Sequence, residues 1–186
     1  MRALSLFSAA MFAGVALAWP GKKKECRALV LSGGGSNGAW EAGVIYGMIN
    51  NGNKKDFEWD VLSGVSAGSI NTMIVSGYPI GQEEQMATYL SDTWNGLKNS
   101  DVWVDWPMGK VAGLTVKAGA LDNSPGLAYM RNIVKGFSKI ERAFVISTTN
   151  VDNGDYIQYT DKMISLSELP DAVISSASIP LIFPPY

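Results

Sequence analysis

A serine between two glycines, where an apolar run meets a helical one, constrains this chain more than any other feature. The run from Trp59 to Ser63 is typical of a buried strand, and Ile70 to Val75 has the apolar spacing of a helix. The join between them includes Gly64-Val65-Ser66-Ala67-Gly68. Such a join requires glycine at both ends, because a Cβ there would strike the neighbouring strand or helix. The pattern predicts a strand, a sharp turn that exposes Ser66, and a helix.

Ser66 is therefore a candidate catalytic nucleophile. Its hydroxyl would lie at a helix N-terminus, where about half a positive charge from unpaired N–H groups favours developing negative charge. An attacking hydroxyl needs such an environment. The alternative is an ordinary loop of small residues, and the strand before the serine and the helix after it favour the catalytic interpretation.

A second glycine motif follows the first predicted strand. Cys26 to Leu31 is predicted to be a buried strand, Ser32 to Gly38 a glycine-rich loop, and Ala39 to Asn50 a helix with Trp40, Val44, Ile45, Met48 and Ile49 on one face. With the strand at Trp59 this gives a β-α-β unit of a parallel sheet. Ligand sites of such sheets lie at the carboxyl ends of the strands, so the glycine loop and Ser66 are expected to converge.

The glycine loop has two chemical interpretations. Gly33-x-Gly35-x-x-Gly38 satisfies the dinucleotide-binding fingerprint, but that site needs an acidic residue at the far end of the second strand, and Glu58 and Asp60 lie at its beginning. The other use is an oxyanion hole, in which each backbone N–H donor is worth roughly 3 to 4 kcal/mol in the transition state of acyl transfer. Only acyl transfer also explains the serine. The predicted donors are Gly33, Gly34 and Gly35.

The rest of the chain predicts supporting elements. A helix from Gln82 to Leu97 is expected to pack on the sheet, and Asp101 to Asn123 is expected to be an irregular lid or rim over the site. Further predictions are a helix at Leu127–Gly136, a hairpin of Arg142–Thr149 and Tyr156–Tyr159 with Asp152 and Asp155 in its turn, and a helix at Leu169–Ser176 capped by Ser167.

Composition limits the chemistry further. The 186 residues are 47% hydrophobic with a net charge of −2, which predicts one globular domain and gives no indication of a nucleic-acid partner. The chain has no histidine, so a Ser-His-Asp triad within it is excluded. No metal-binding cluster and no phosphate-binding GxxxxGK[ST] loop occurs, and neither a metal nor an organic cofactor is expected.

The N-terminal segment resembles a secretory signal. An apolar run follows Arg2, and Ala16-Leu17-Ala18 has the A-x-A form of a cleavage site, so residues 1–18 are predicted to be a signal peptide of a protein that is secreted or enters the secretory lumen. The alternative is an uncleaved membrane anchor followed by Lys22, Lys23 and Lys24. Cys26 is the single cysteine, and its place before a strand predicts a buried thiol.

Taken together, these motifs resemble the patatin-like phospholipases, which are lipid acyl hydrolases with a Ser-Asp dyad. The resemblance covers residues 26–186 and depends on the Gly33–Gly38 loop, the Gly64–Gly68 motif, and Ala177-Ser178-Ile179-Pro180 with Phe183-Pro184-Pro185. It implies a three-layer α/β/α sandwich with a mainly parallel central sheet. It also implies Ser66 as nucleophile, the glycine-loop amides as oxyanion hole, and ester lipids or phospholipids as substrates. Transient contact of Trp103 and Trp106 with a membrane surface is one interpretation of the 101–123 segment, and packing within the loop is the favoured one.

The chain departs from the family pattern at two places. Asn37 stands where the family usually has Arg or Lys, which removes a charge that would recognise phosphate. The family's aspartate belongs to a D-G-G or D-G-A motif after the Phe-Pro-Pro segment, so it is expected beyond Tyr186, in a domain whose apolar end predicts a continuation. Asp152 and Asp155 precede that segment and do not match it. The alternative function is therefore a non-catalytic protein that binds acyl lipids.

Overall fold

A four-stranded sheet in the order β1-β2-β5-β6 forms the centre of the computed structural model, which describes residues 25–186. The strands are β1 (Ala28–Leu31), β2 (Val61–Gly64), β5 (Ala143–Thr149) and β6 (Tyr156–Thr160). β1, β2 and β5 are parallel, and β6 returns antiparallel to β5 through the predicted hairpin. The prediction of an α/β fold with a mainly parallel sheet is confirmed. The predicted signal peptide, residues 1–18, lies outside the described residues.

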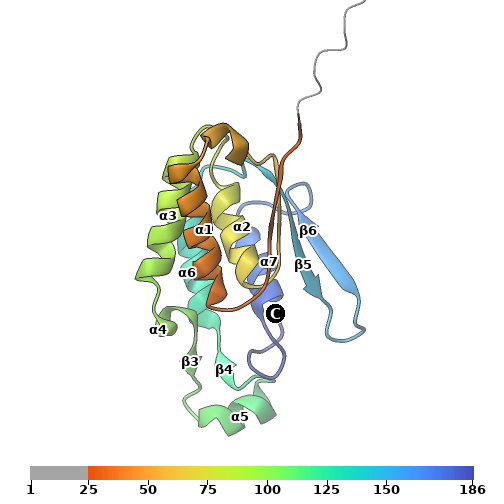
Figure 1. Cartoon of the computed structure of the whole chain (residues 1–186). Helices are drawn as coiled ribbons and strands as arrows, with labels where there is room; N and C mark the ends of the chain where they lie inside the picture. Colours follow the sequence, from red (N-terminus) through yellow and green to blue (C-terminus); the bar gives the residue numbers. More distant parts are fainter. Residues whose placement is uncertain (1–24) are drawn as a thin grey trace, which may run out of the picture.

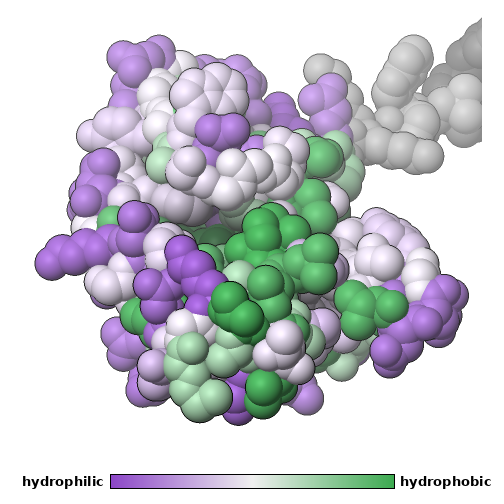
Figure 2. Space-filling view, turned by 90° about the horizontal axis from the view of Figure 1, so that it is seen from below, coloured by the Kyte–Doolittle hydropathy of each residue, from purple (hydrophilic) through white to green (hydrophobic). Residues whose placement is uncertain are grey.

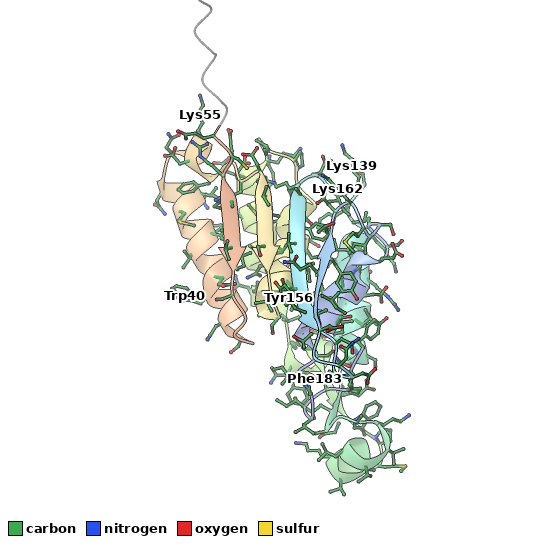
Figure 3. The ribbon with its side chains drawn as sticks, turned by 90° about the vertical axis from the view of Figure 1, so that its right-hand side faces the viewer. Trp40, Lys55, Lys139, Tyr156, Lys162 and Phe183 are labelled. Atoms are coloured by element: carbon green, nitrogen blue, oxygen red, sulfur yellow. The ribbon has the colours of Figure 1, made fainter. Side chains whose placement is uncertain are left out.

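The long helices lie on one side of this sheet, as the two views in Figures 1 and 3 agree. They are α1 (Asn37–Asn51), α2 (Ala67–Ser76), α3 (Glu83–Gly96), α6 (Ser124–Val134) and α7 (Leu169–Ala177). A short 3-10 helix, η1 (Lys54–Phe57), precedes β2. α2 is the central helix, because it contacts β1, β2 and β5 as well as α1, α3 and α7. The opposite face of the sheet exposes side chains such as Val30, which is 75% exposed.

Helix α3 does not pack on the sheet as predicted. Its main contacts are with α1 and α2, so it forms an outer layer, and Met86 and Leu90 bury its apolar side there. The cause is the position of α2, which already covers the sheet between β1 and β5. The helix does have the predicted amphipathic character, because it buries this apolar side and exposes Glu84 to solvent.

The buried face of α1 also differs from the prediction. Ala42, Ile45 and Ile49 are buried, whereas Trp40 is 71% exposed and Val44 is also exposed. The helix approaches α2 through its small residues, because a Cβ on Gly38 would lie 3.0 Å from the Ala67 Cβ. The prediction placed the largest apolar side chains of α1 in the interface, but the close approach of α1 to α2 requires the smallest ones.

Two further predictions are wrong. Cys26 is exposed rather than buried, because it lies two positions before β1 begins at Ala28. Helix α7 is capped at Glu168 and not at Ser167, and the Glu168 carboxylate accepts hydrogen bonds from the N–H and the hydroxyl of Ser165. These hydrogen bonds lower the pKa of Glu168.

Residues 99–122 form an ordered extension, not the irregular segment that was predicted. Its elements are α4 (Asn99–Val102), β3 (Val104–Asp105), α5 (Gly109–Val116) and β4 (Leu121–Asp122), with β3 and β4 antiparallel. Trp106 closes it by donating from Nε1 to the Gly119 carbonyl at 2.9 Å. Figure 1 shows the extension projecting below the sheet, beyond the carboxyl ends of the parallel strands.

The opposite end of the sheet is fixed by a buried ion pair. Arg142, which precedes β5, contacts Glu83 at 3.0 Å and donates to the carbonyls of Trp59, Tyr78 and Pro79. Burial lowers the pKa of the Arg142 guanidinium, and the Glu83 carboxylate opposes that effect. The pair joins β2, β5 and the start of α3. Over residues 25–186, none of the helices has the length and apolar character needed to cross a membrane.

Candidate active site

The turn at Ser66 has the strained geometry that the sequence predicts. Ser66 lies between β2 and α2 with φ 53° and ψ −123°, a conformation that L-residues rarely adopt. Such strain costs on the order of 1 to 3 kcal/mol and persists only where the surrounding structure holds it. A Cβ on Gly68 would lie 2.6 Å from the Leu31 carbonyl carbon, and one on Gly64 would overlap Thr72 and the Gly68 carbonyl. The steric conflict expected for a Cβ at either motif glycine is therefore present in the structure.

A chain of serines fixes this turn from the other side. The Ser66 N–H donates to Ser176 Oγ at 2.8 Å, and Ser176 Oγ in turn donates to the Ser147 carbonyl at 2.6 Å. Ser69 Oγ donates to the Ser66 carbonyl at 2.5 Å. The nucleophile turn is thus attached to α7 and β5 as well as to its own helix. Sequence reasoning did not identify Ser176, because its only local sign is the small-residue run before the Phe-Pro-Pro segment.

The glycine loop lies beside the serine, as expected. It connects β1 to α1, and the Val65 N–H donates to the Leu31 carbonyl at 3.3 Å where the two motifs meet. A Cβ on Gly33 would lie 3.1 Å from Ser66 Cβ and 3.8 Å from Ser66 Oγ. The loop and the nucleophile therefore face the same small space. The convergence predicted for the two motifs is confirmed.

The amides of the loop are free to bind a ligand. Among residues 25–186, no acceptor receives a hydrogen bond from the N–H groups of Gly33, Gly34 or Gly35. The loop is exposed to solvent, and Gly35 has φ 57°, which turns the chain back toward α1. Successive unpaired amides in such a turn form an anion-binding concavity. This arrangement fits the predicted oxyanion hole.

A network of polar side chains holds the loop in place. Glu41 Oε1 accepts from the N–H and the hydroxyl of Ser32 at 2.8 and 3.1 Å, and Glu41 Oε2 accepts from Asn71 Nδ2 at 3.1 Å. Asn71 also donates to the Gly38 carbonyl and accepts from Trp94 Nε1 at 2.7 Å. Thus α1, α2 and α3 all support the loop. Sequence reasoning missed these residues, because their partners are distant in the chain.

Two clefts adjoin this region. A wide cleft of about 940 Å³ is lined by Val65 and Ser176, and also by Pro180, Pro185 and Tyr186 near the end of the chain, so it borders the nucleophile turn. A narrow cleft of about 70 Å³ runs between the helices and is almost entirely apolar; its lining includes Ile70, one turn after Ser66 on α2. Burial raises the pKa of Tyr129, which also lines the narrow cleft. Figure 2 views this end of the molecule and shows hydrophobic surface across its middle.

The remaining predicted residues lie apart from the serine hydroxyl. Asp152 and Asp155 are exposed in the β5–β6 turn, as expected, although Asp152 reaches the rim of the wide cleft. Asn37 begins α1, and its side chain packs over Gly34. Within residues 25–186, no carboxylate is hydrogen-bonded to Ser66 Oγ. The dyad aspartate stays a prediction.

Comparison with protein families gives a match over most of the chain. The family model for patatin-like phospholipase matches residues 29–186. No curated protein matches the chain. Among solved structures, VipD from Legionella pneumophila is similar at 13% identity with a TM-score of 0.46, over 86% of this chain. The chain spans 43% of the VipD chain.

Proposed function

Because the chain belongs to the patatin-like phospholipase family, we propose that it provides the nucleophile and the oxyanion hole of a lipid acyl hydrolase. The observation that carries this proposal is the placement of the three unpaired loop amides beside a serine on a strained turn. The family match supports lipid ester hydrolysis at the level of the family, and the patatin-like fold class is confirmed by the same match. The roles of individual residues are part of the proposal.

In the proposed reaction Ser66 Oγ attacks the carbonyl carbon of a lipid ester. The carbonyl oxygen becomes an oxyanion that accepts hydrogen bonds from the amides of Gly33, Gly34 and Gly35, while the alcohol part of the lipid leaves with a proton. Water then attacks the acyl-enzyme, releases the fatty acid and restores the Ser66 hydroxyl. The family pattern assigns the serine proton to an aspartate after Tyr186, and an apolar, partly dry site would raise the pKa of that aspartate.

The two clefts suggest how the lipid is oriented. The narrow apolar cleft begins one helical turn from Ser66 and suits an acyl chain, because its lining offers little polar surface. The wide cleft, which carries hydroxyl and amide groups from Ser147 to Asn150, suits the polar part of the lipid. Asn37 offers hydrogen bonds without a charge, so recognition of the head group would depend on polar contacts rather than on an ion pair.

A second candidate function is lipid binding without turnover. It is favoured by one observation, which is that no carboxylate among residues 25–186 is hydrogen-bonded to the serine hydroxyl. A fluorophosphonate probe separates the two functions, because only an activated serine is phosphonylated. A protein that binds a fluorescent fatty acid but does not react with the probe would support the binding function.

The decisive variant is Ser66→Ala. We expect it to abolish fluorophosphonate labelling and to lower hydrolysis of a fluorogenic fatty ester by about 10³-fold or more, since the covalent intermediate cannot form. Ser138→Ala is the matched control, because Ser138 is exposed in the loop before β5, next to Lys139 at the far end of the sheet in Figure 3. Unchanged ester turnover in Ser66→Ala would remove Ser66 from the mechanism.

A further inference from the structure

The outer side of the extension carries exposed apolar side chains. Met108 and Val111 are 75% and 78% exposed, and Leu114 and Val116 on the same helix are also exposed. Leu181, on the neighbouring segment of the chain, is 74% exposed. We name these five residues the docking patch. Figure 2 views the molecule from the end that carries the extension and shows hydrophobic surface there.

The fold does not need these side chains for its own packing. Helix α5 attaches through its opposite side, where Gly113 is buried against Trp106. The segment after α5 is fixed by backbone bonds, since the N–H groups of Ala120 and Leu121 donate to the carbonyls of Leu181 and Ile182, both at 2.9 Å. The docking patch is therefore a set of exposed apolar side chains on a well-anchored support, and exposed apolar surface of this kind is typical of an interaction site.

The charges around the patch indicate what kind of partner it fits. Lys110 pairs with Asp105 at 3.8 Å, and Lys117 lies over the Trp106 ring at 5.6 Å from its centroid. The two cations of the α5 region are thus both engaged within the extension, so it presents no concentrated positive field. A partner recognised mainly by apolar contact, such as a lipid surface without net charge, fits better than an anionic one.

The position of the patch relative to the clefts supports a lipid partner. The narrow apolar cleft is lined by Val102 of α4, which belongs to the extension, by Asn123, which directly follows it, and by Phe183, which follows the segment paired with it. Asn123 Nδ2 donates to Ser178 Oγ at 2.8 Å and fixes this junction. The extension lies beyond the carboxyl ends of the parallel strands (Figure 1). The wide cleft is lined by Val65, which follows β2, and by Thr149 at the end of β5. An acyl chain drawn from a bilayer beneath the patch would meet the narrow cleft at this junction.

We propose that the docking patch inserts into the surface of a zwitterionic phospholipid bilayer and places the clefts over the lipid. The purpose of this docking depends on the function proposed above, but the binding itself does not. The strength of such insertion scales with the apolar area that it buries. Because a zwitterionic bilayer has no net charge, the binding should be insensitive to salt.

The test measures sedimentation of Ser66→Ala protein with phosphatidylcholine vesicles, so that turnover cannot alter the lipid. We expect the added double change Met108→Asp with Val111→Asp to weaken vesicle binding by about 10-fold or more, because two carboxylates would enter the apolar layer. Met163→Asp is the matched control: Met163 is 65% exposed, in the turn after β6, and its change should leave binding intact. Equal binding by the double variant and the control would overturn the proposal.

Three further measurements distinguish other occupants of the patch and separate a failure of docking from a failure of the proposed function. Release of the protein from vesicles by 0.5 M salt would show electrostatic binding and overturn the proposal. A dimer in the absence of lipid that the double variant dissociates would assign the patch to a second copy and would likewise overturn it. With Ser66 restored, fluorophosphonate labelling in solution should be equal in the double variant and the unaltered protein. If neither the unaltered protein nor the double variant is labelled, but vesicle binding still depends on the patch, the proposed function would be refuted and the docking supported.

Discussion

The two glycine motifs lie side by side but use glycine for different reasons. In the nucleophile turn, a Cβ on Gly64 or Gly68 would overlap backbone atoms of the neighbouring segments. In the loop after β1, a Cβ on Gly35 would meet nothing within 4 Å, and one on Gly34 would meet only the Asn37 side chain. The turn needs glycine for packing. Gly38 at the end of the loop motif packs closely as well, against Ala67, whereas the loop glycines Gly33 to Gly35 expose N–H groups and allow a left-handed bend at Gly35.

This difference assigns the glycines of the turn to the stability of the fold and the glycines of the loop to the chemistry of the site. Substitution in the turn should disrupt the contact between β1 and α2 and so affect the whole domain. Substitution in the loop should leave the domain folded and affect only what the loop binds. The two motifs thus predict opposite outcomes when stability and serine reactivity are measured on the same variants.

The largest expected effect is that of Gly68→Ala. Its methyl group would lie 2.6 Å from the Leu31 carbonyl carbon and 2.7 Å from the Ser32 carbonyl oxygen, and neither backbone segment can move without separating β1 from α2. We expect the free energy of unfolding to fall by about 3 kcal/mol in urea denaturation. Gly47→Ala, in open space on α1, is the control and should not destabilise. Similar stabilities for the two variants would contradict the packing role of the turn.

The second largest effect is expected from Gly33→Ala, which tests the role of the glycine loop. The methyl group would lie 3.8 Å from Ser66 Oγ, in the space where an oxyanion would sit. We expect fluorophosphonate labelling of Ser66 to slow by about 10²-fold, while the free energy of unfolding changes by less than about 1 kcal/mol. Gly43→Ala, on the open side of α1, should label at the original rate. A large loss of stability with unchanged labelling would reverse the assignment.

A smaller effect is expected from Glu41→Gln. Glutamine can offer its oxygen to Ser32 or to Asn71, but its NH₂ group would then face a donor on the other side. The loop should lose its fixed position, so we expect labelling of Ser66 to fall by about 10-fold with the fold retained. Glu84→Gln removes a glutamate that pairs with Lys54 at the surface, and it should change nothing. Wild-type reactivity in Glu41→Gln would show that the network does not position the loop.

The smallest effect concerns the strain at the nucleophile itself. Ser66→Gly should raise the free energy of unfolding by about 1 kcal/mol relative to Ser66→Ala, because glycine adopts the backbone conformation of Ser66 without steric cost. Both variants lack the hydroxyl, so thermal unfolding compares the backbone alone. If the Ser66→Gly protein is no more stable than the Ser66→Ala protein, the turn is less strained than its dihedral angles indicate.

The sequence predicted the site well where local rules decide the structure. The strands and helices around Ser66 and the Gly33–Gly38 loop follow from glycine placement and apolar runs, and all appear at the expected places. The supporting residues escaped prediction, because Glu41, Asn71 and Ser176 act on partners in other elements. Trp40 was assigned to the wrong side of α1, since hydrophobicity alone does not reveal that small residues make the closest contacts.

The extension was missed for a different physical reason. Its strands have two residues each and α5 has eight, which is too short for a periodic pattern to be visible in the sequence. The segment was expected to be an irregular lid or rim, but Trp106 packs inside it and donates a hydrogen bond to the Gly119 carbonyl. The side chains that reach outward are aliphatic.

One carbonyl group links the two halves of the site. The Leu31 oxygen accepts from the Val65 amide, and a Cβ built on Gly68 would meet the same carbonyl group first. Local opening of the oxyanion loop away from Ser66 would therefore have to break the junction of β1 and α2 in the core. The Val65 amide hydrogen should exchange with solvent only as fast as the whole domain unfolds, so heat would not inactivate the site before it melts the protein.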